Sequence, residues 1–123
     1  MSDTANPGNL ASAPIGSAAE FDARLKRTDE NRWLATRYAP VAARESLVAI
    51  YVLHQELGRA LQTKEAMLGK NRTQWWRETL AQIAAAGPLR RHDLSVELAR
   101  VLANRPDLIA PVTDMIDRFH GVI

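Results

Sequence analysis

The sequence contains no cysteine, and this absence excludes several kinds of site. A chain without thiols cannot form disulfides, iron–sulfur clusters or thiolate zinc sites. The lack of disulfides agrees with a reducing compartment, and we therefore expect a cytoplasmic or matrix-like location, peripheral to a membrane.

Long apolar runs are also missing. The longest apolar-rich stretch, Ser46 to Leu61, is interrupted by polar and charged residues and is too mixed to span a bilayer. Residues 1–7 have no cationic region followed by an apolar run, so no secretory signal is predicted. We expect a chain with neither a transmembrane segment nor a secretory leader.

Charge of one sign is scarce as well. The 16 basic and 14 acidic residues give a net charge of only +2, and they are mixed along the chain. Nucleic-acid arms are blocks of like charge, and none is present. The sequence therefore does not predict nucleic-acid binding.

What is present fits one globular domain. Apolar residues make up 46% of the 123 positions and charged residues 24%, which is ordinary for a folded protein. Residues 1–17 are rich in Ala, Ser, Gly, Asn and Pro. Such a segment buries too little surface to offset its ordering entropy. We expect a flexible tail, or an arm that orders on a partner, followed by a single domain over residues 18–123.

The domain is predicted to be all-α, a bundle of about five to six helices. Apolar residues recur at helical spacing, and no segment shows strand-like alternation. Asp29 and Asp93 are candidate N-caps, while Pro40 and Gly87-Pro88 mark helix boundaries. The expected helices span Ala19–Lys26, Asn31–Tyr38, Val41–Gln62, Lys64–Ala86 with a possible break at Gly69, Leu94–Asn104 and Leu108–Phe119.

The central helix, Val41–Gln62, has an apolar stripe. At 100° per residue one face carries Leu47, Ile50, Tyr51, His54, Leu57, Gly58 and Leu61. Arg44, Glu45, Glu56 and Arg59 lie away from the centre of that face. The pattern predicts that the stripe points inward and that Glu56 points to the opposite side.

The titratable side chains give weak signals for chemistry. His54 lies within the stripe, where a core histidine is more common than a catalytic or ligand-binding one. His92 is expected on a loop and His120 at a frayed end. Asp114 and Asp117, three residues apart, share a helix face and could bind a divalent ion, although a solvated acidic face is the more ordinary interpretation.

The pair Trp75-Trp76, followed by Arg77, is the most unusual cluster in the sequence. Neighbouring helical residues point about 100° apart, so one indole can fill the core while the other packs elsewhere. In one interpretation both indole side chains lie in the core. The other is a partner-binding site, since Trp and Arg dominate such sites; Tyr51 and His54 are further candidates for partner contact.

Three segments resemble the squalene/phytoene synthase family. The run from Asn31 to Pro40, NRWLATRYAP, resembles the opening of these proteins. Ala43 to Leu53, ARESLVAIYVL, resembles their first long helix, and Asn71 to Glu78, NRTQWWRE, closely matches their Q-W-W-R-E segment. The resemblance covers about residues 29–119 and implies the front half of an isoprenoid-synthase-type helical bundle.

The resemblance also implies which residues should carry the chemistry. Active members join two prenyl diphosphates and use two D-x-x-x-D motifs, whose carboxylates hold magnesium ions against the diphosphate. The first motif aligns here with Gly58 and Gln62, and neither residue is acidic. We therefore assign no catalytic residue and expect no metal or other cofactor. Magnesium would be the cofactor only if the chain were part of a prenyl-diphosphate transferase.

The nearest resemblance is to relatives that lack these acids, including the phytoene synthase-related complex I assembly factor. It implies a non-catalytic interaction protein, an accessory or assembly subunit of a respiratory-type membrane complex, which docks on another protein or on a second copy of itself. The alternative is a divergent or split prenyl-diphosphate transferase completed by another chain. A third hypothesis is a helical regulator that binds a small apolar ligand or nucleic acid. The scattered basic residues argue against nucleic acid.

Overall fold

The computed structural model describes residues 13–89 and 92–123, and within these ranges the regular structure is entirely helical. Six α-helices and one short 3₁₀ segment follow in chain order. They are α1 Ala18–Thr28, α2 Glu30–Arg37, α3 Val41–Leu61, α4 Ala66–Ala84, α5 Asp93–Ala103, η3 Pro106–Leu108 and α6 Ile109–Val122. The predicted all-α class is confirmed, and each expected helix has a counterpart.

The predicted tail over residues 1–17 lies partly outside the described residues, which begin at 13. Residues 13–17 form a turn that leads into α1. Ser17 is the N-cap of that helix, and its Oγ accepts a hydrogen bond of 3.2 Å from the Glu20 amide. Phe21 and Leu25, one helical turn apart, are buried on the face of α1 that meets the core.

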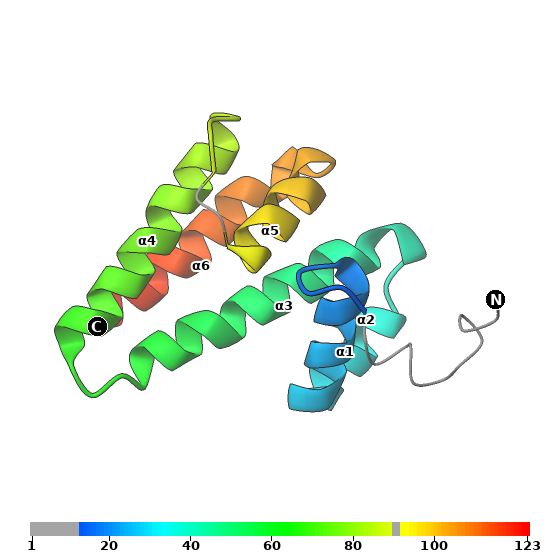
Figure 1. Cartoon of the computed structure of the whole chain (residues 1–123), viewed down its shortest axis with the longest axis horizontal. Coiled ribbons are helices and arrows are strands. Elements are labelled where there is room, and N and C mark those ends of the chain that lie inside the picture. Colours follow the sequence, from blue (N-terminus) through cyan, green and yellow to red (C-terminus); the bar gives the residue numbers. More distant parts are fainter. Residues whose placement is uncertain (1–12, 90–91) are drawn as a thin grey trace.

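The long helix α3 organises the fold. Pro40 precedes its first residue, as predicted, because proline fixes a φ that suits a helix start. The helix contacts each of the other five α-helices. Figure 1 shows α1 and α2 against its N-terminal half, with α4, α5 and α6 grouped on the other side.

The beginning and end of α4 differ from expectation. No break occurs at Gly69, which is a buried residue inside a continuous helix. The helix ends at Ala84, and Ala86 rather than Gly87 takes the left-handed conformation, with φ 54°. The Gly87 amide donates to the Gln82 carbonyl at 2.9 Å, which closes the helix end.

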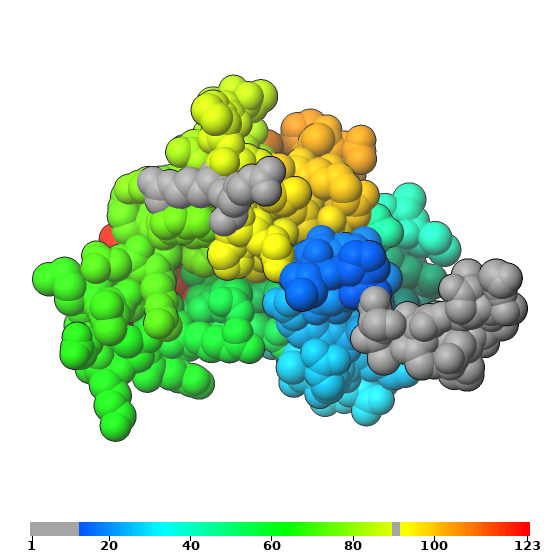
Figure 2. Space-filling model, in the orientation of Figure 1, coloured from blue at the N-terminus to red at the C-terminus, as the bar shows by residue number. Residues whose placement is uncertain are grey.

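The start of α5 also corrects a prediction. Its N-cap is His92, not Asp93, because Nδ1 of His92 accepts a hydrogen bond of 3.2 Å from the Leu94 amide. Asp93 is the first helical residue, where a carboxylate suits the positive end of the helix. This start lies beside the turn before α1, since a Cβ on Gly16 would meet Asp93 Cβ at 3.2 Å. Figure 2 shows the two segments in contact at the surface.

The core runs along α3 and is mostly aliphatic. Its centre is formed by side chains that are at most 1% exposed: Phe21, Leu25, Ala49, Val52, Leu53, Leu57, Leu80, Leu94, Leu98, Leu102 and Ile116. Trp76 of α4 adds a large aromatic side chain, at 6% exposed, and the partly buried Trp75 and Phe119 pack against this core. No helix among the described residues is both long and apolar enough to cross a membrane.

Candidate functional site

The face of α3 that is buried is not the one predicted. Of the seven predicted inward positions only Leu57 is fully buried, while Leu61 is 44% exposed and the others are half-buried. The buried positions are Ser46, Val48, Ala49, Val52, Leu53, Leu57 and Ala60. Small residues such as Ser46, Ala49 and Ala60 let neighbouring helices approach closely, and a hydropathy pattern underrates them.

The exposed side of α3 carries an open hollow around the two positions that align with the first acidic motif of the family. Gly58 and Gln62 both line it, so the i, i+4 spacing does place them on one face. The hollow has a volume of about 360 Å³. Its other lining residues come from α3 and the α1–α2 junction: Thr28, Asp29, Arg32, His54, Gln55 and Arg59.

Four polar residues of this hollow are already paired with one another. Asp29 accepts from the Arg32 amide at 3.3 Å and pairs with its guanidinium at 3.0 Å, so it serves as the cap of α2. This confirms the predicted N-cap. Gln55 donates to Thr28 Oγ1 at 2.9 Å, which ties α3 to the end of α1.

These residues do not fit a magnesium–diphosphate group. Magnesium in such sites needs anionic oxygen ligands; glycine supplies none, and the Gln62 amide supplies one neutral oxygen. The single carboxylate of the hollow, Asp29, is held by Arg32. Among residues 13–89 and 92–123, no group of three or more His, Asp or Glu side chains is placed to hold a metal ion.

His54 lies at the edge of this hollow and is half-buried. Its ring meets the Phe119 ring edge-on, with centroids 5.4 Å apart. Burial lowers the pKa of His54 below its usual value of 6.5; the charge of Arg32 lowers it further, and Asp29 opposes both. His54 therefore packs on an aromatic ring at the margin of the core and is not a fully buried core histidine.

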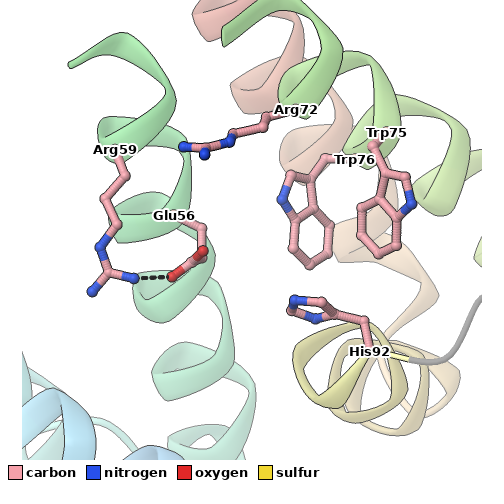
Figure 3. Close-up of a pocket in the computed structure, with 6 residues that line it drawn as sticks. All are labelled: Glu56, Arg59, Arg72, Trp75, Trp76 and His92. Carbon is pink, nitrogen blue, oxygen red and sulfur yellow. Dashed lines mark hydrogen bonds and ion pairs between the residues drawn. The ribbon is translucent and has the colours of Figure 1, made fainter. Parts of the chain in front are cut away.

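A second pocket lies on the other side of α3, facing α4 and the start of α5 (Figure 3). Its volume is about 250 Å³. Six residues line it: Glu56, Arg59, Arg72, Trp75, Trp76 and His92. Glu56 lies here, on the side of α3 away from Gly58 and Gln62, as predicted. That side faces α4 and the start of α5 rather than open solvent.

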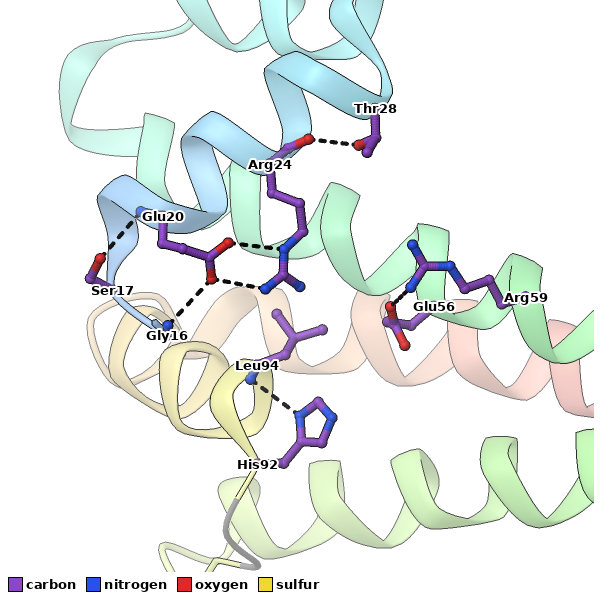
Figure 4. Close-up of polar contacts among 9 residues, drawn as sticks. All are labelled: Gly16, Ser17, Glu20, Arg24, Thr28, Glu56, Arg59, His92 and Leu94. Carbon is purple, nitrogen blue, oxygen red and sulfur yellow. Dashed lines mark hydrogen bonds and ion pairs between the residues drawn. The ribbon is translucent and has the colours of Figure 1, made fainter. Parts of the chain in front are cut away.

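The aromatic wall of this pocket is made of three rings. Trp75 and Trp76 are adjacent on α4 and meet edge to face, with centroids 4.8 Å apart. The His92 ring lies 5.4 Å from each indole. His92 was expected to decorate a loop; instead it caps α5 through its bond to the Leu94 amide (Figure 4). Its ring also completes the aromatic wall.

The charged wall lies opposite. Glu56 and Arg59, one turn apart on α3, form an ion pair. Arg72 extends from α4 and reaches Thr63 Oγ1 at 3.3 Å. Within the part of the chain that the structure describes, Arg72 has no carboxylate partner, so the pocket carries one uncompensated positive charge.

A family model described as squalene/phytoene synthase matches residues 25–121. The chain belongs to this family. Searches among curated proteins and among solved structures gave no significant match. The match covers the segments from which the resemblance was inferred, and it confirms the family, while the branch that includes the complex I assembly factor stays a prediction.

The five residues predicted to contact a partner do not form one patch. Trp75 and Trp76 lie in the pocket between α3, α4 and α5, where Trp76 belongs to the core. Arg77 faces α6 and pairs with Asp117 at 2.9 Å. His54 and Tyr51 lie on α3, and His54 lines the other hollow.

Two of the remaining titratable candidates, His120 and Asp117, have structural partners. His120 is not frayed: its Nδ1 lies 2.6 Å from Thr73 Oγ1, and its carbonyl accepts from Lys70 Nζ at 2.7 Å. Asp114 is exposed on α6. Sequence reasoning missed Glu56, Arg59, Arg72 and His92 as one group, since they come from three separate segments and only the helix packing brings them together.

Proposed function

We propose that this member of the squalene/phytoene synthase family is a non-catalytic helical interaction protein, an accessory or assembly subunit of a respiratory-type membrane protein complex. One observation carries the proposal. The two positions that align with the first acidic motif, Gly58 and Gln62, line one hollow. Their side chains are a hydrogen and an amide, where the motif has two carboxylates. A magnesium-held diphosphate requires anionic oxygens at that place.

The charges around the hollow support the same proposal. Asp29 lies close enough to line it but is committed to Arg32 and to the cap of α2. Glu56 belongs to the opposite side of the helix, where it pairs with Arg59. Moving either carboxylate to a metal would therefore break an ion pair that the fold already contains.

A partner in this proposal is another protein subunit. Large hydrophobic side chains remain exposed on α2, directly after it and at the end of α3: Leu34 at 43%, Tyr38 at 89% and Leu61 at 44%. Contact with a second protein would bury such residues, and nothing in the charge pattern favours a nucleic acid. We place this partner in a membrane-associated complex in a reducing compartment.

The first experiment measures the native assembly. The chain, carrying an affinity tag, is isolated from its source cells under mild detergent, and the mass and composition of the assembly are determined. We expect a defined complex larger than one chain, in which a membrane-complex subunit is present in fixed proportion. A monomer with no partner would contradict the assembly role.

The second experiment tests the missing chemistry. Farnesyl diphosphate is titrated into the chain by calorimetry with and without Mg²⁺, and we expect no magnesium-dependent binding. The double variant Gly58→Asp/Gln62→Asp should gain such binding, because nothing lies within 4 Å of a Cβ placed on Gly58. Gly58→Asn/Gln62→Asn is the matched uncharged control. Magnesium-dependent binding by the unaltered chain would overturn the non-catalytic assignment.

The second candidate is a divergent or split prenyl-diphosphate transferase, and the family match over residues 25–121 favours it. Under this alternative another chain supplies the acidic motif. Magnesium-dependent consumption of farnesyl or geranylgeranyl diphosphate by the purified assembly, but not by this chain alone, would support it over the interaction protein.

A further inference from the structure

The pocket between α3, α4 and the start of α5 is independent of the hollow at Gly58 and Gln62. The two share Arg59 but otherwise have different lining residues. The proposed partner role uses neither the rings nor the unpaired cation of this pocket. Its volume of about 250 Å³ exceeds the roughly 150 Å³ of an apolar cavity known to hold benzene.

The rings favour a flat apolar group. Trp75 and Trp76 stand nearly perpendicular, at 89°, and His92 is inclined at 57° to Trp75 and 83° to Trp76. Figure 3 shows the His92 ring below the two indoles, with the charged side chains across from them. Aromatic rings attract one another in offset or edge-on geometry beyond the effect of buried area. An aromatic ligand can therefore contact two or three of these rings at once.

The charges favour one negative group. Glu56 compensates Arg59, and this leaves the guanidinium of Arg72 as the net positive charge of the lining. The guanidinium presents a planar set of N–H donors that matches a carboxylate. Among the described lining residues this net charge of one matches a monoanion, and it repels a cation.

His92 adds a hydrogen-bond donor to the aromatic wall of the pocket. Its Nδ1 accepts from the Leu94 amide, so the proton of a neutral imidazole lies on Nε2. The ring also sits at the N-terminal end of α5, where the helix dipole is positive. Both features act in the same direction as Arg72.

We propose that this pocket binds a small aromatic carboxylate. Its ring lies against Trp75, Trp76 and His92, and its carboxylate is held by Arg72. Neither the ring nor the charge alone is sufficient, because the described residues join an aromatic wall to the unpaired cation of Arg72.

The test uses the full chain with 2-naphthoate as the probe. The chain has three Trp residues, and their indole N–H signals can be followed by NMR. Trp33 is the internal reference, because it lies in another part of the fold. Its indole N–H donates a hydrogen bond of 2.8 Å to Asp22 Oδ1. Its signal is assigned with the Trp33→Phe variant. We expect the signals of Trp75 and Trp76 to shift with saturation, while that of Trp33 stays in place.

Two further ligands separate the ring from the charge. The neutral 2-naphthamide should bind at least roughly ten-fold more weakly, because it loses the charged hydrogen bond. Inorganic phosphate should shift the two indole signals little, since it has no ring. Equal affinity for naphthamide, or tight binding of phosphate, would overturn the proposal, as would movement of all three Trp signals together.

Arg72→Gln and Arg77→Gln form a matched pair of variants. Both arginines are exposed on α4, but Arg77 pairs with Asp117 and does not line the pocket. Arg72→Gln should weaken naphthoate binding roughly ten-fold or more, and Arg77→Gln should leave it unchanged. Thermal unfolding confirms that each variant is folded. An equal loss in both variants would show a general charge effect and overturn the assignment of Arg72.

Discussion

The two long sides of α3 differ in how the rest of the chain covers them. On one side Ala49, Leu53 and Ala60 are no more than 2% exposed. On the other side His54 and Gly58 are half-buried beside an open hollow. The closed side therefore specifies the fold. The open side is left to function, because its residues contribute less packing and so tolerate change.

The largest test of this contrast is a matched pair of leucine truncations. Leu53 is 0% exposed on the closed side and Leu61 is 44% exposed at the end of the same helix. Leu53→Ala should lower the free energy of unfolding by about 2–5 kcal/mol, since it leaves a cavity. Leu61→Ala should lower it by about 0.5 kcal/mol. Urea unfolding measures both, and comparable losses would break the distinction between the two sides.

The glycines of α3 and α4 sharpen the comparison at the backbone. A Cβ on Gly69 would lie 2.7 Å from the Ala60 carbonyl oxygen, so α3 and α4 would have to separate. Gly69→Ala should therefore cost about 1–3 kcal/mol of stability. Nothing lies within 4 Å of a Cβ placed on Gly58. Gly58→Ala should therefore raise the free energy of unfolding by about 0.5–1 kcal/mol, because alanine favours the helix. The midpoint of urea unfolding should move in opposite directions for the two variants.

Acid should weaken the fold through two histidines. Burial is the main cause that lowers the pKa of His54, and also that of His120, where Lys70 and Arg77 add to it and Asp117 opposes. The unfolded chain then binds protons more readily than the folded one. The contribution of these two histidines to the free energy of unfolding is fully present above pH 6.5, the ordinary histidine pKa. It is lost as the pH falls below that value.

The check compares the urea midpoint at about pH 7.5 and about pH 5.5. His54→Gln and His120→Gln should each reduce the fall, and the double variant should reduce it most. A fall of the same size in the double variant would assign the acid sensitivity to other groups.

The smallest expected effect comes from a surface ion pair on α4 and α6. Arg77 and Asp117 are 2.9 Å apart, with side chains 42% and 46% exposed. Asp117→Asn should cost about 0.2–1 kcal/mol at low salt, because solvent screens exposed pairs. The cost should shrink in about 1 M NaCl. A loss that persists at high salt would show that this open edge is packed more tightly than its exposure indicates.

Local sequence determined the helices and several of their ends. Phe21 and Leu25 at helical spacing, Asp29 as a cap and Pro40 before α3 all act through neighbours within one turn, so they could be predicted. The family could also be predicted, since the segments from Asn31 to Glu78 lie within the matched region. The chemistry at Gly58 and Gln62 is likewise a matter of residue type.

Only the tertiary structure decided which side of α3 is buried and what Glu56 meets. Helices pack on α3 from several directions, so its hydrophobic stripe does not identify a single inward face. The pocket of Trp75, Trp76, Arg72 and His92 depends on α4 and α5 meeting across α3. No spacing within a segment encodes that meeting, because it results from the shapes of surfaces that are distant in the sequence.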